Sequence, residues 1–345
     1  MTIEDFARAI PKIELHLHLE GAVLPSTFVA LAEKNGLALP PFDDVMELYR
    51  YGNLLDFLKI YDLVSRSVQK PDDFHRITYE ALSSAASGGA RYVEFFFSPH
   101  AHLASGITYP EMLDGIIAGM HDAETDKGVA SRLIPAHAKP LGPEKGIAFV
   151  EMVAANRRDE VIGIGTDYDE LPDSPAVFKA MYDRARALGL HVTAHAGEVG
   201  PAAFVREAID DLKVERVDHG YNVVDDPALV ARCRDEGVFF TCCPSTTLYT
   251  TTFTDLASPD HAIRRMIDAG LKVTLNTDDP PMFGTNISDE FALVARTLKL
   301  TPAEFRACTM NAIDASWLDA GTKRTLRTEW SAEIDRLEKE LVSGN

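Results

Sequence analysis

The stretch Lys12-Ile13-Glu14-Leu15-His16-Leu17-His18-Leu19 alternates polar and apolar side chains, a pattern typical of a β-strand. Because alternate side chains of a strand lie on one face, His16 and His18 are expected to point the same way, about 7 Å apart. Two imidazoles on one face, with a third from another strand and a carboxylate, make a ligand set for a divalent metal such as zinc. The stretch therefore predicts one strand of the fold and one side of a metal site.

Seven further strand-like runs follow along the chain, and longer segments with helical periodicity separate them. The helical spacing of apolar residues is clear in Pro25–Lys34, Ser174–Leu188 and Pro201–Leu212. Repeated strand–helix alternation predicts a parallel sheet with helices packed outside it. The eight strand-like runs are Lys12–Leu19, Arg91–Phe97, Arg132–His137, Val161–Thr166, His191–His195, Arg216–His219, Val238–Cys243 and Lys272–Asn276.

Residues with metal-binding or acid–base chemistry gather where these runs end. His18, His195, His219 and Asp278 all lie at or just past the carboxyl end of a predicted strand. Barrel enzymes place their chemistry at this end of the strands. An open doubly wound sheet is the alternative, but it brings only a few strand ends together at one crevice. Four separate strand ends therefore favour a closed (β/α)₈ TIM barrel.

Two segments exceed what a simple barrel needs. The connection Leu37–Phe57 is long and is expected to lie over the barrel mouth. The stretch Pro302–Leu341 has a helical pattern, and its charged part, Arg327–Glu340, is expected to pack outside the barrel with a solvated face. No Gly/Ser-rich linker interrupts the chain. We therefore expect residues 1–345 to form a single barrel domain with extra helices at the C-terminus.

Composition excludes several classes of partner. The net charge of −19 over 345 residues argues against general binding to nucleic acid or to an anionic membrane. No apolar run approaches membrane-spanning length, and Met1–Ala9 lacks the apolar core of a signal peptide, so a cytoplasmic location is expected. The four cysteines include no Cys-x-x-Cys pattern, so no disulfide framework is predicted. The oligomeric state stays open.

Three further residues are candidates for acid–base chemistry beside the metal: Glu198, His219 and Asp279. Gly197 lets the chain turn after His195, so that Glu198 can swing back over the pocket; the alternative is that Glu198 caps the following helix. For Asp278-Asp279 the alternative is an exposed turn. Adjacent carboxylates repel each other unless a metal or substrate holds them.

A second His-x-His pair lies at His100 and His102. It follows Ser98-Pro99, which ends the second predicted strand, and so it falls on a loop. We interpret these two histidines as pocket wall or plain surface, not as metal ligands.

Four motifs in order, together with a late helical Asn-Ala-Ile, resemble the adenosine/adenine deaminase family of metal-dependent aminohydrolases nearly from end to end. They are Pro11-Lys12-Ile13-Glu14-Leu15-His16-Leu17-His18-Leu19-Glu20-Gly21, Ala194-His195-Ala196-Gly197-Glu198, Arg216-Val217-Asp218-His219-Gly220, Asn276-Thr277-Asp278-Asp279-Pro280 and Asn311-Ala312-Ile313.

Within that family the details are more similar to adenine deaminases than to adenosine deaminases. Glu20 stands where the nucleoside enzymes usually carry an aspartate that helps to hold the ribose, and Asp218 and the segment Gly163–Asp167 also resemble the free-base group. One departure is Ser245-Thr246-Thr247 after Cys243-Pro244, where the family commonly has a variable residue and then Ser-Asn. The departure suggests a modified adenine or another 6-aminopurine as substrate.

The resemblance implies that one Zn²⁺ is held by His16, His18, His195 and Asp278, leaving a position for water. It further implies hydrolytic deamination of the purine at C6. Glu198 would donate a proton to N1, and His219 would take or steer the proton of the water. Asp279 would bond N7 or orient the water, and Glu20 and the backbone at Gly197 would position the base.

Three other functions stay open at this point. The chain could deaminate adenosine or a derivative of it. It could be a binuclear amidohydrolase, although such sites usually need a lysine at the end of strand four and Val161–Asp167 contains none. It could also be a purine-binding protein without catalysis, although its ligand and acid–base set is complete.

Overall fold

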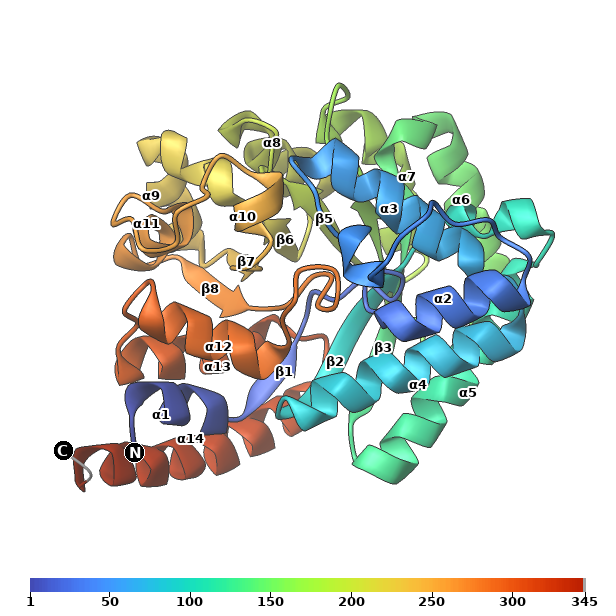
Figure 1. The fold of residues 1–345 in the computed structure, drawn as a ribbon. Helices are drawn as coiled ribbons and strands as arrows, with labels where there is room; N and C mark the ends of the chain where they lie inside the picture. Colours follow the sequence, from blue (N-terminus) through green and yellow to red (C-terminus); the bar gives the residue numbers. More distant parts are fainter. Residues whose placement is uncertain (344–345) are drawn as a thin grey trace.

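Eight parallel strands pair in chain order from β1 to β8 in the computed structural model, which describes residues 1–343 (Figure 1). Two backbone hydrogen bonds complete the ring between the segments that follow β1 and β8: Asp278 N donates to His16 O at 2.9 Å, and His18 N donates to Asp278 O at 2.8 Å. The predicted TIM barrel is confirmed. The strands are β1 Lys12–Glu14, β2 Ala90–Phe97, β3 Ala130–Ala138, β4 Gly163–Asp167, β5 His191–Ala196, β6 Arg216–His219, β7 Phe239–Cys242 and β8 Lys272–Leu275.

Helices surround the barrel, as the strand–helix alternation predicts (Figure 1). The α-helices are α1 Ile3–Ala9, α2 Pro25–Lys34, α3 Leu54–Ser67, α4 Pro71–Ser87, α5 Tyr109–Lys127, α6 Pro143–Ala155, α7 Lys179–Ala187, α8 Ala202–Glu207, α9 Pro227–Glu236, α10 Thr247–Thr250, α11 Ala262–Asp268, α12 Ile287–Arg296, α13 Pro302–Ala315 and α14 Ala320–Ser343. Single turns of 3₁₀-helix lie at Val45–Glu47, Pro99–Ala101, Leu103–Ser105, Lys139–Leu141, Pro175–Phe178 and Tyr221–Asp225, and a π-helical turn lies at Ala208–Leu212.

The first strand is shorter than its alternating pattern predicts, because regular pairing ends at Glu14. Beyond it the chain bonds β2 on one side, where Phe96 N donates to Leu17 O at 2.8 Å, and the segment after β8 on the other. His16 and His18 therefore lie past the regular strand, in a stretch held by isolated parallel bridges. Bonding on both sides fixes this stretch as firmly as a strand.

The long connection after α2 leads into α3, whose first two turns reach the barrel mouth. Of the predicted segment Leu37–Phe57, the residues that line the pocket are Leu54 and Phe57. At the far end of the chain, α14 lies along the outside of the barrel beside α1 and α13 (Figure 1). Trp330, Ile334 and Leu337 are the buried residues of α14 that face the body of the protein. The predicted outer position of the charged terminal helix is confirmed.

An ion pair fills part of the barrel interior below the mouth. The Arg216 guanidinium lies 2.5 Å from the Glu94 carboxylate, and both side chains are fully buried. The Trp317 ring lies 4.1 Å from the guanidinium, and the Trp317 backbone N–H donates to Glu94 at 2.6 Å. Pairing of this kind offsets the cost of burying two charges.

Among residues 1–343, no helix is both long enough and apolar enough to cross a membrane.

Candidate active site

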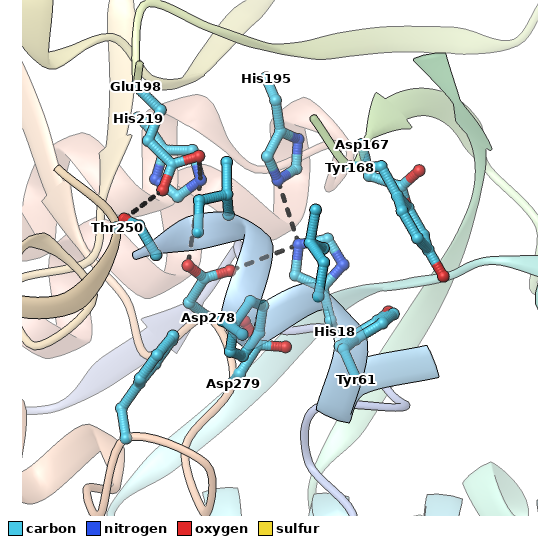
Figure 2. Close-up of a pocket in the computed structure, with 14 residues that line it drawn as sticks. His18, Tyr61, Asp167, Tyr168, His195, Glu198, His219, Thr250, Asp278 and Asp279 are labelled. Atoms are coloured by element: carbon cyan, nitrogen blue, oxygen red, sulfur yellow. Dashed lines mark hydrogen bonds and ion pairs between the residues drawn. The ribbon is translucent and has the colours of Figure 1, made fainter. Parts of the chain in front are cut away.

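The predicted site residues come together at the carboxyl end of the barrel. His16 and His18 follow β1, and His195 lies on β5. His219 ends β6, and Asp278 and Asp279 follow β8. All six side chains are buried, and Figure 2 shows most of them converging on one pocket.

Three imidazoles and one carboxylate meet at a single point. One ligand atom from each of His16, His18, His195 and Asp278 lies within 4.8 Å of the others. His18 Nε2 is 3.1 Å from His195 Nε2 and 3.3 Å from Asp278 Oδ1. His16 Nε2 forms no hydrogen bond within the described chain and lies 3.2 Å from the same Asp278 oxygen. Nitrogen lone pairs that converge in this way on a carboxylate fit a zinc ion.

Protonation states at this cluster agree with metal binding. Burial lowers the pKa of His18 to about 4, so its imidazole is neutral and keeps a free lone pair at neutral pH. Burial by itself would raise the pKa of Asp278, but the neighbouring histidines outweigh it and hold that pKa far below its usual range. Neutral imidazole and ionised carboxylate are the forms that ligate a metal.

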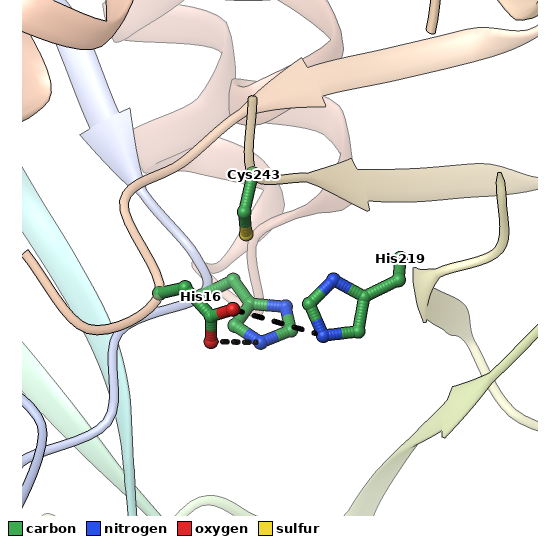
Figure 3. Close-up of side chains that lie close together, drawn as sticks. His16, His219 and Cys243 are labelled. Carbon is green, nitrogen blue, oxygen red and sulfur yellow. Dashed lines mark ion pairs between the residues drawn. The ribbon is translucent and has the colours of Figure 1, made fainter. Parts of the chain in front are cut away.

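A second group of possible ligands, His16, His219, Cys243 and Asp278, overlaps the first. Figure 3 labels its two histidines and its cysteine. The second group shares His16 and Asp278 with the first group, so one ion cannot use both sets fully. Burial raises the pKa of the Cys243 thiol well above its ordinary value, which disfavours the thiolate before a metal binds. The three-histidine set needs no such deprotonation, so it fits a zinc ion better.

Asp218 supports two of the histidines from beneath. Its carboxylate accepts hydrogen bonds from Thr193 at 2.8 Å and Thr241 at 3.0 Å, and Thr241 Oγ1 lies 2.9 Å from His16 Nδ1. Its Oδ2 atom is 3.6 Å from His195 Nδ1. Carboxylates behind metal-binding histidines fix ring orientation. The sequence indicates Asp218 as a feature shared with the free-base group, but not as a support for the histidines.

Glu198 turns into the pocket and does not cap the next helix. Gly197 has φ 79°, and a Cβ at this position would lie 2.5 Å from Val205, so the turn requires glycine. The Glu198 carboxylate accepts a hydrogen bond from Thr250 Oγ1 at 2.5 Å and lies 3.7 Å from His219 Nε2. Burial raises the pKa of Glu198, which favours the protonated acid.

A buried ion pair holds the loop that carries Glu198. Glu170 accepts backbone hydrogen bonds from Glu198 at 3.3 Å, Val199 at 3.2 Å and Gly200 at 2.6 Å. Lys139 Nζ lies 3.8 Å from Glu170 and donates to the carbonyl of His195. Neither residue belongs to a motif, so sequence reasoning missed both.

Asp279 is buried beside Asp278, and its Oδ1 atom has no hydrogen-bond partner within the described chain. Burial, followed by the charge of Asp278, raises the pKa of Asp279 far above its usual value. A Cβ on Gly21 would lie 1.6 Å from Asp279 Oδ1, so glycine is required there.

Two residues reach the site with left-handed backbones, since His219 and Asp278 both have φ 64°.

Glu20 lies behind the pocket wall. Its carboxylate accepts hydrogen bonds from Ser98 N at 2.8 Å and Tyr61 Oη at 3.1 Å, and His102 Nε2 lies 2.9 Å from it. The predicted contact between Glu20 and substrate stays a prediction, and Tyr61 is the side chain that faces the pocket at this point. His102 is correspondingly buried as a partner of Glu20, so its interpretation as pocket wall or surface is wrong.

The pocket holds about 380 Å³ of empty space, including its opening to solvent. Helix α3 supplies an apolar wall, and four carboxyl side chains face the interior without any lysine or arginine among the lining residues described. The lining residues are His18, Leu54, Phe57, Leu58, Tyr61, Asp167, Tyr168, His195, Glu198, His219, Thr250, Asp278, Asp279 and Phe283 (Figure 2).

A parallel barrel with three histidines, an aspartate and a buried carboxylic acid at its mouth defines a metal-dependent hydrolase. Comparison with known proteins identifies the family. The model of the adenosine deaminase family matches residues 11–332, and the chain belongs to this family.

Relatives with names and solved structures are similar over almost the whole chain. The adenine deaminase of Rhodospirillum rubrum is 38% identical over 329 residues, which cover 95% of this chain and 98% of that protein. The adenine deaminase of Streptomyces coelicolor is 38% identical, with 96% of each chain covered. A zinc-bound amidohydrolase from Burkholderia ambifaria superposes with TM-score 0.92 at 39% identity, covering 99% of this chain and 94% of its own.

Proposed function

We propose that this protein is a zinc-dependent aminohydrolase that converts a 6-aminopurine and water into the 6-oxopurine and ammonia, with adenine as the substrate. The convergence of His16, His18, His195 and Asp278 beside a buried Glu198, whose pKa burial raises, carries the proposal. The named adenine deaminase relatives support it.

The proposed roles follow from the geometry. When bound, zinc supplies the acidification of water, whose pKa falls to about 7 in comparable hydrolases. His219 Nε2 faces both Glu198 and Asp278, so it lies where it can take the proton of the attacking water. Glu198 holds a proton for purine N1, which becomes basic as C6 turns tetrahedral. Burial and the charge of Asp278 raise the pKa of Asp279, which favours the protonated acid that would donate to N7.

Positioning of the base falls to the pocket walls. Phe57 and Phe283 are stacked on each other with ring centroids 5.0 Å apart at the pocket edge, and Leu54 and Leu58 extend this apolar surface. Such a wall covers an uncharged ring and excludes water from the reacting atoms. Because no cation lines the pocket in the part of the chain that is described, it gives no support for a substrate phosphate.

The experiment is ammonia release by purified, zinc-loaded protein. The substrates are adenine, N6-methyladenine, adenosine and AMP, compared at equal concentration. We expect adenine to give the highest kcat/KM and AMP to give none. Higher kcat/KM for N6-methyladenine would assign the modified base, which the apolar α3 wall favours as second candidate. Release from adenosine alone would overturn the free-base proposal, and two zinc ions per chain would indicate a binuclear amidohydrolase.

We also propose that the chain works as one domain. All strands from β1 to β8 belong to one sheet, and the site uses residues that follow both its first and its last strand.

A further inference from the structure

Asp167 ends β4 and carries a buried carboxylate that the proposed mechanism does not use. It is 2% exposed and lines the pocket. Its Oδ2 atom accepts a hydrogen bond from Ser98 Oγ, whereas Oδ1 has no hydrogen-bond partner in the described structure. A buried carboxylate oxygen without a donor is costly, so a donor from a ligand at this point would be strongly favoured.

The surroundings of Asp167 do not supply that donor. Burial and the nearby charge of Glu20 raise its pKa to about 7. The positive charge of Lys139 lowers the pKa of Asp167. The Lys139 ammonium, however, donates to the His195 carbonyl and pairs with Glu170 at 3.8 Å. The free oxygen of Asp167 is therefore an acceptor that the protein itself leaves open.

Its place in the pocket indicates which part of a purine it would meet. Figure 2 shows Asp167 and Tyr168 on one side of His18 and His195, and Glu198 and Thr250 on the other. With N1 at Glu198 and N7 at Asp279, the opposite edge of the ring, N3–C4–N9, faces away from the acid–base groups. In a 6-aminopurine free base, N9–H is the hydrogen-bond donor of that edge.

We propose that Asp167 Oδ1 accepts the N9–H of the bound base and so selects free 6-aminopurines over their 9-substituted forms. This inference rests on the proposed function. In a nucleoside the N9 proton is replaced by a sugar carbon, which removes the donor and places bulk against a buried carboxylate. A site built to bond a substrate N–H discriminates strongly against an analogue that lacks it, because its own polar group is then left unpaired.

The test uses 9-methyladenine, which differs from adenine by one methyl group at the atom in question. Zinc-loaded wild-type protein and Asp167→Ala are compared for kcat/KM on both substrates. We expect the wild type to favour adenine by at least about 100-fold, and the variant to lose about 10- to 100-fold on adenine with little loss on 9-methyladenine. Asp62→Asn is the matched control: Asp62 is exposed and accepts a hydrogen bond from Tyr168 Oη at 2.8 Å, so it removes a carboxylate next to the same wall.

A second variant and a third substrate complete the test. Asp167→Asn keeps a weaker, neutral acceptor and should give an intermediate preference, with hypoxanthine and 9-methylhypoxanthine binding measured by calorimetry as a readout independent of turnover. On 3-deazaadenine, which keeps N9–H but lacks N3, the Asp167→Ala penalty should persist. If that penalty disappears, Asp167 donates to N3 and the proposal is wrong.

Equal losses on adenine and 9-methyladenine would also overturn it, since Asp167 would then have only a structural role. These outcomes differ from failure of the proposed function. In that case wild-type protein releases no ammonia from any 6-aminopurine, and the Asp167 inference falls with it.

Discussion

The two ends of the barrel treat buried ionisable groups in different ways. Below the mouth, Arg216 and Glu94 are paired with each other and with the backbone around Trp317. At the mouth, Asp167 and Asp279 are equally buried, yet each keeps an oxygen with no hydrogen-bond partner in the described structure. Both arrangements are costly to build, but only the first places opposite charges in contact, although Arg216 Nε has no hydrogen-bond partner in the described structure. The ion pair supports the fold, whereas the open carboxyl oxygens that face the pocket indicate where a ligand binds.

Replacing the acid at the mouth should give the largest change. In Glu198→Gln the side chain keeps its shape but cannot supply a proton to N1. We expect kcat to fall by 10²- to 10⁴-fold, the usual range for a general acid. The measurement is ammonia release, with metal analysis and circular dichroism as controls. Near wild-type turnover with zinc fully bound would contradict the assignment.

Breaking the pair below the mouth should reduce stability and spare the chemistry. Arg216→Met leaves Glu94 buried without its partner, which costs about 3 to 5 kcal/mol of unfolding free energy. The double variant Arg216→Met/Glu94→Leu should recover much of that loss, because no charge is left unpaired. Urea unfolding measures both. A double variant as unstable as the single one would show that packing against Trp317, and not charge pairing, dominates.

Removing the metal should lower the stability of the whole fold. Zinc binds the folded chain, so at 1,000 times its dissociation constant it adds about 4 kcal/mol to the unfolding free energy. Dialysis against a chelator should therefore lower the melting temperature, and added zinc should restore it. His195→Ala should show a much smaller response to zinc. An unchanged melting temperature after verified metal removal would argue against a zinc site at this cluster.

The smallest expected effect concerns Thr250, the last residue of α10. The Thr250 hydroxyl lowers the pKa of Glu198 through its hydrogen bond, so Thr250→Val should raise that pKa. Because the reaction needs protonated Glu198, the alkaline limb of the kcat profile should move to higher pH. We expect kcat to fall about tenfold, in keeping with a lost hydrogen bond. Thr251→Val is the control, since Thr251 donates to the Thr247 carbonyl instead. Identical profiles for the two variants would exclude a role for Thr250.

Sequence patterns predict the frame of this molecule because strand–helix alternation and strand-end chemistry are local signals. The positions of His195, His219 and Asp278 at the mouth follow from the strands that carry them. The early end of β1 could not be predicted, because it depends on backbone bonds to β2 and to the segment after β8. The alternating pattern does not show which neighbour a strand will bond.

For a similar reason, the sequence cannot show which of two buried carboxylates, Glu20 or Asp167, keeps an oxygen open toward the substrate. Glu20 belongs to a motif and is expected at the substrate, whereas Asp167 is only the last residue of the segment Gly163–Asp167. Ser98 and His102, from the loop after β2, take up the Glu20 carboxylate. A single serine hydroxyl bonds Asp167 and leaves one oxygen free. Only the folded arrangement shows how these donors are divided.

His219 and Asp278 adopt φ 64°, where a side chain is sterically disfavoured by roughly 1 kcal/mol or more. Glycine at either position would relax the backbone and remove a group that the proposed chemistry needs. A library of this gene selected only for heat resistance in the presence of a chelator, so that bound zinc contributes no stability, should therefore drift toward glycine or asparagine at these two codons and become inactive. Thermal stability and catalysis favour different residues at these two positions. Variants engineered for stability should therefore be screened for loss of activity.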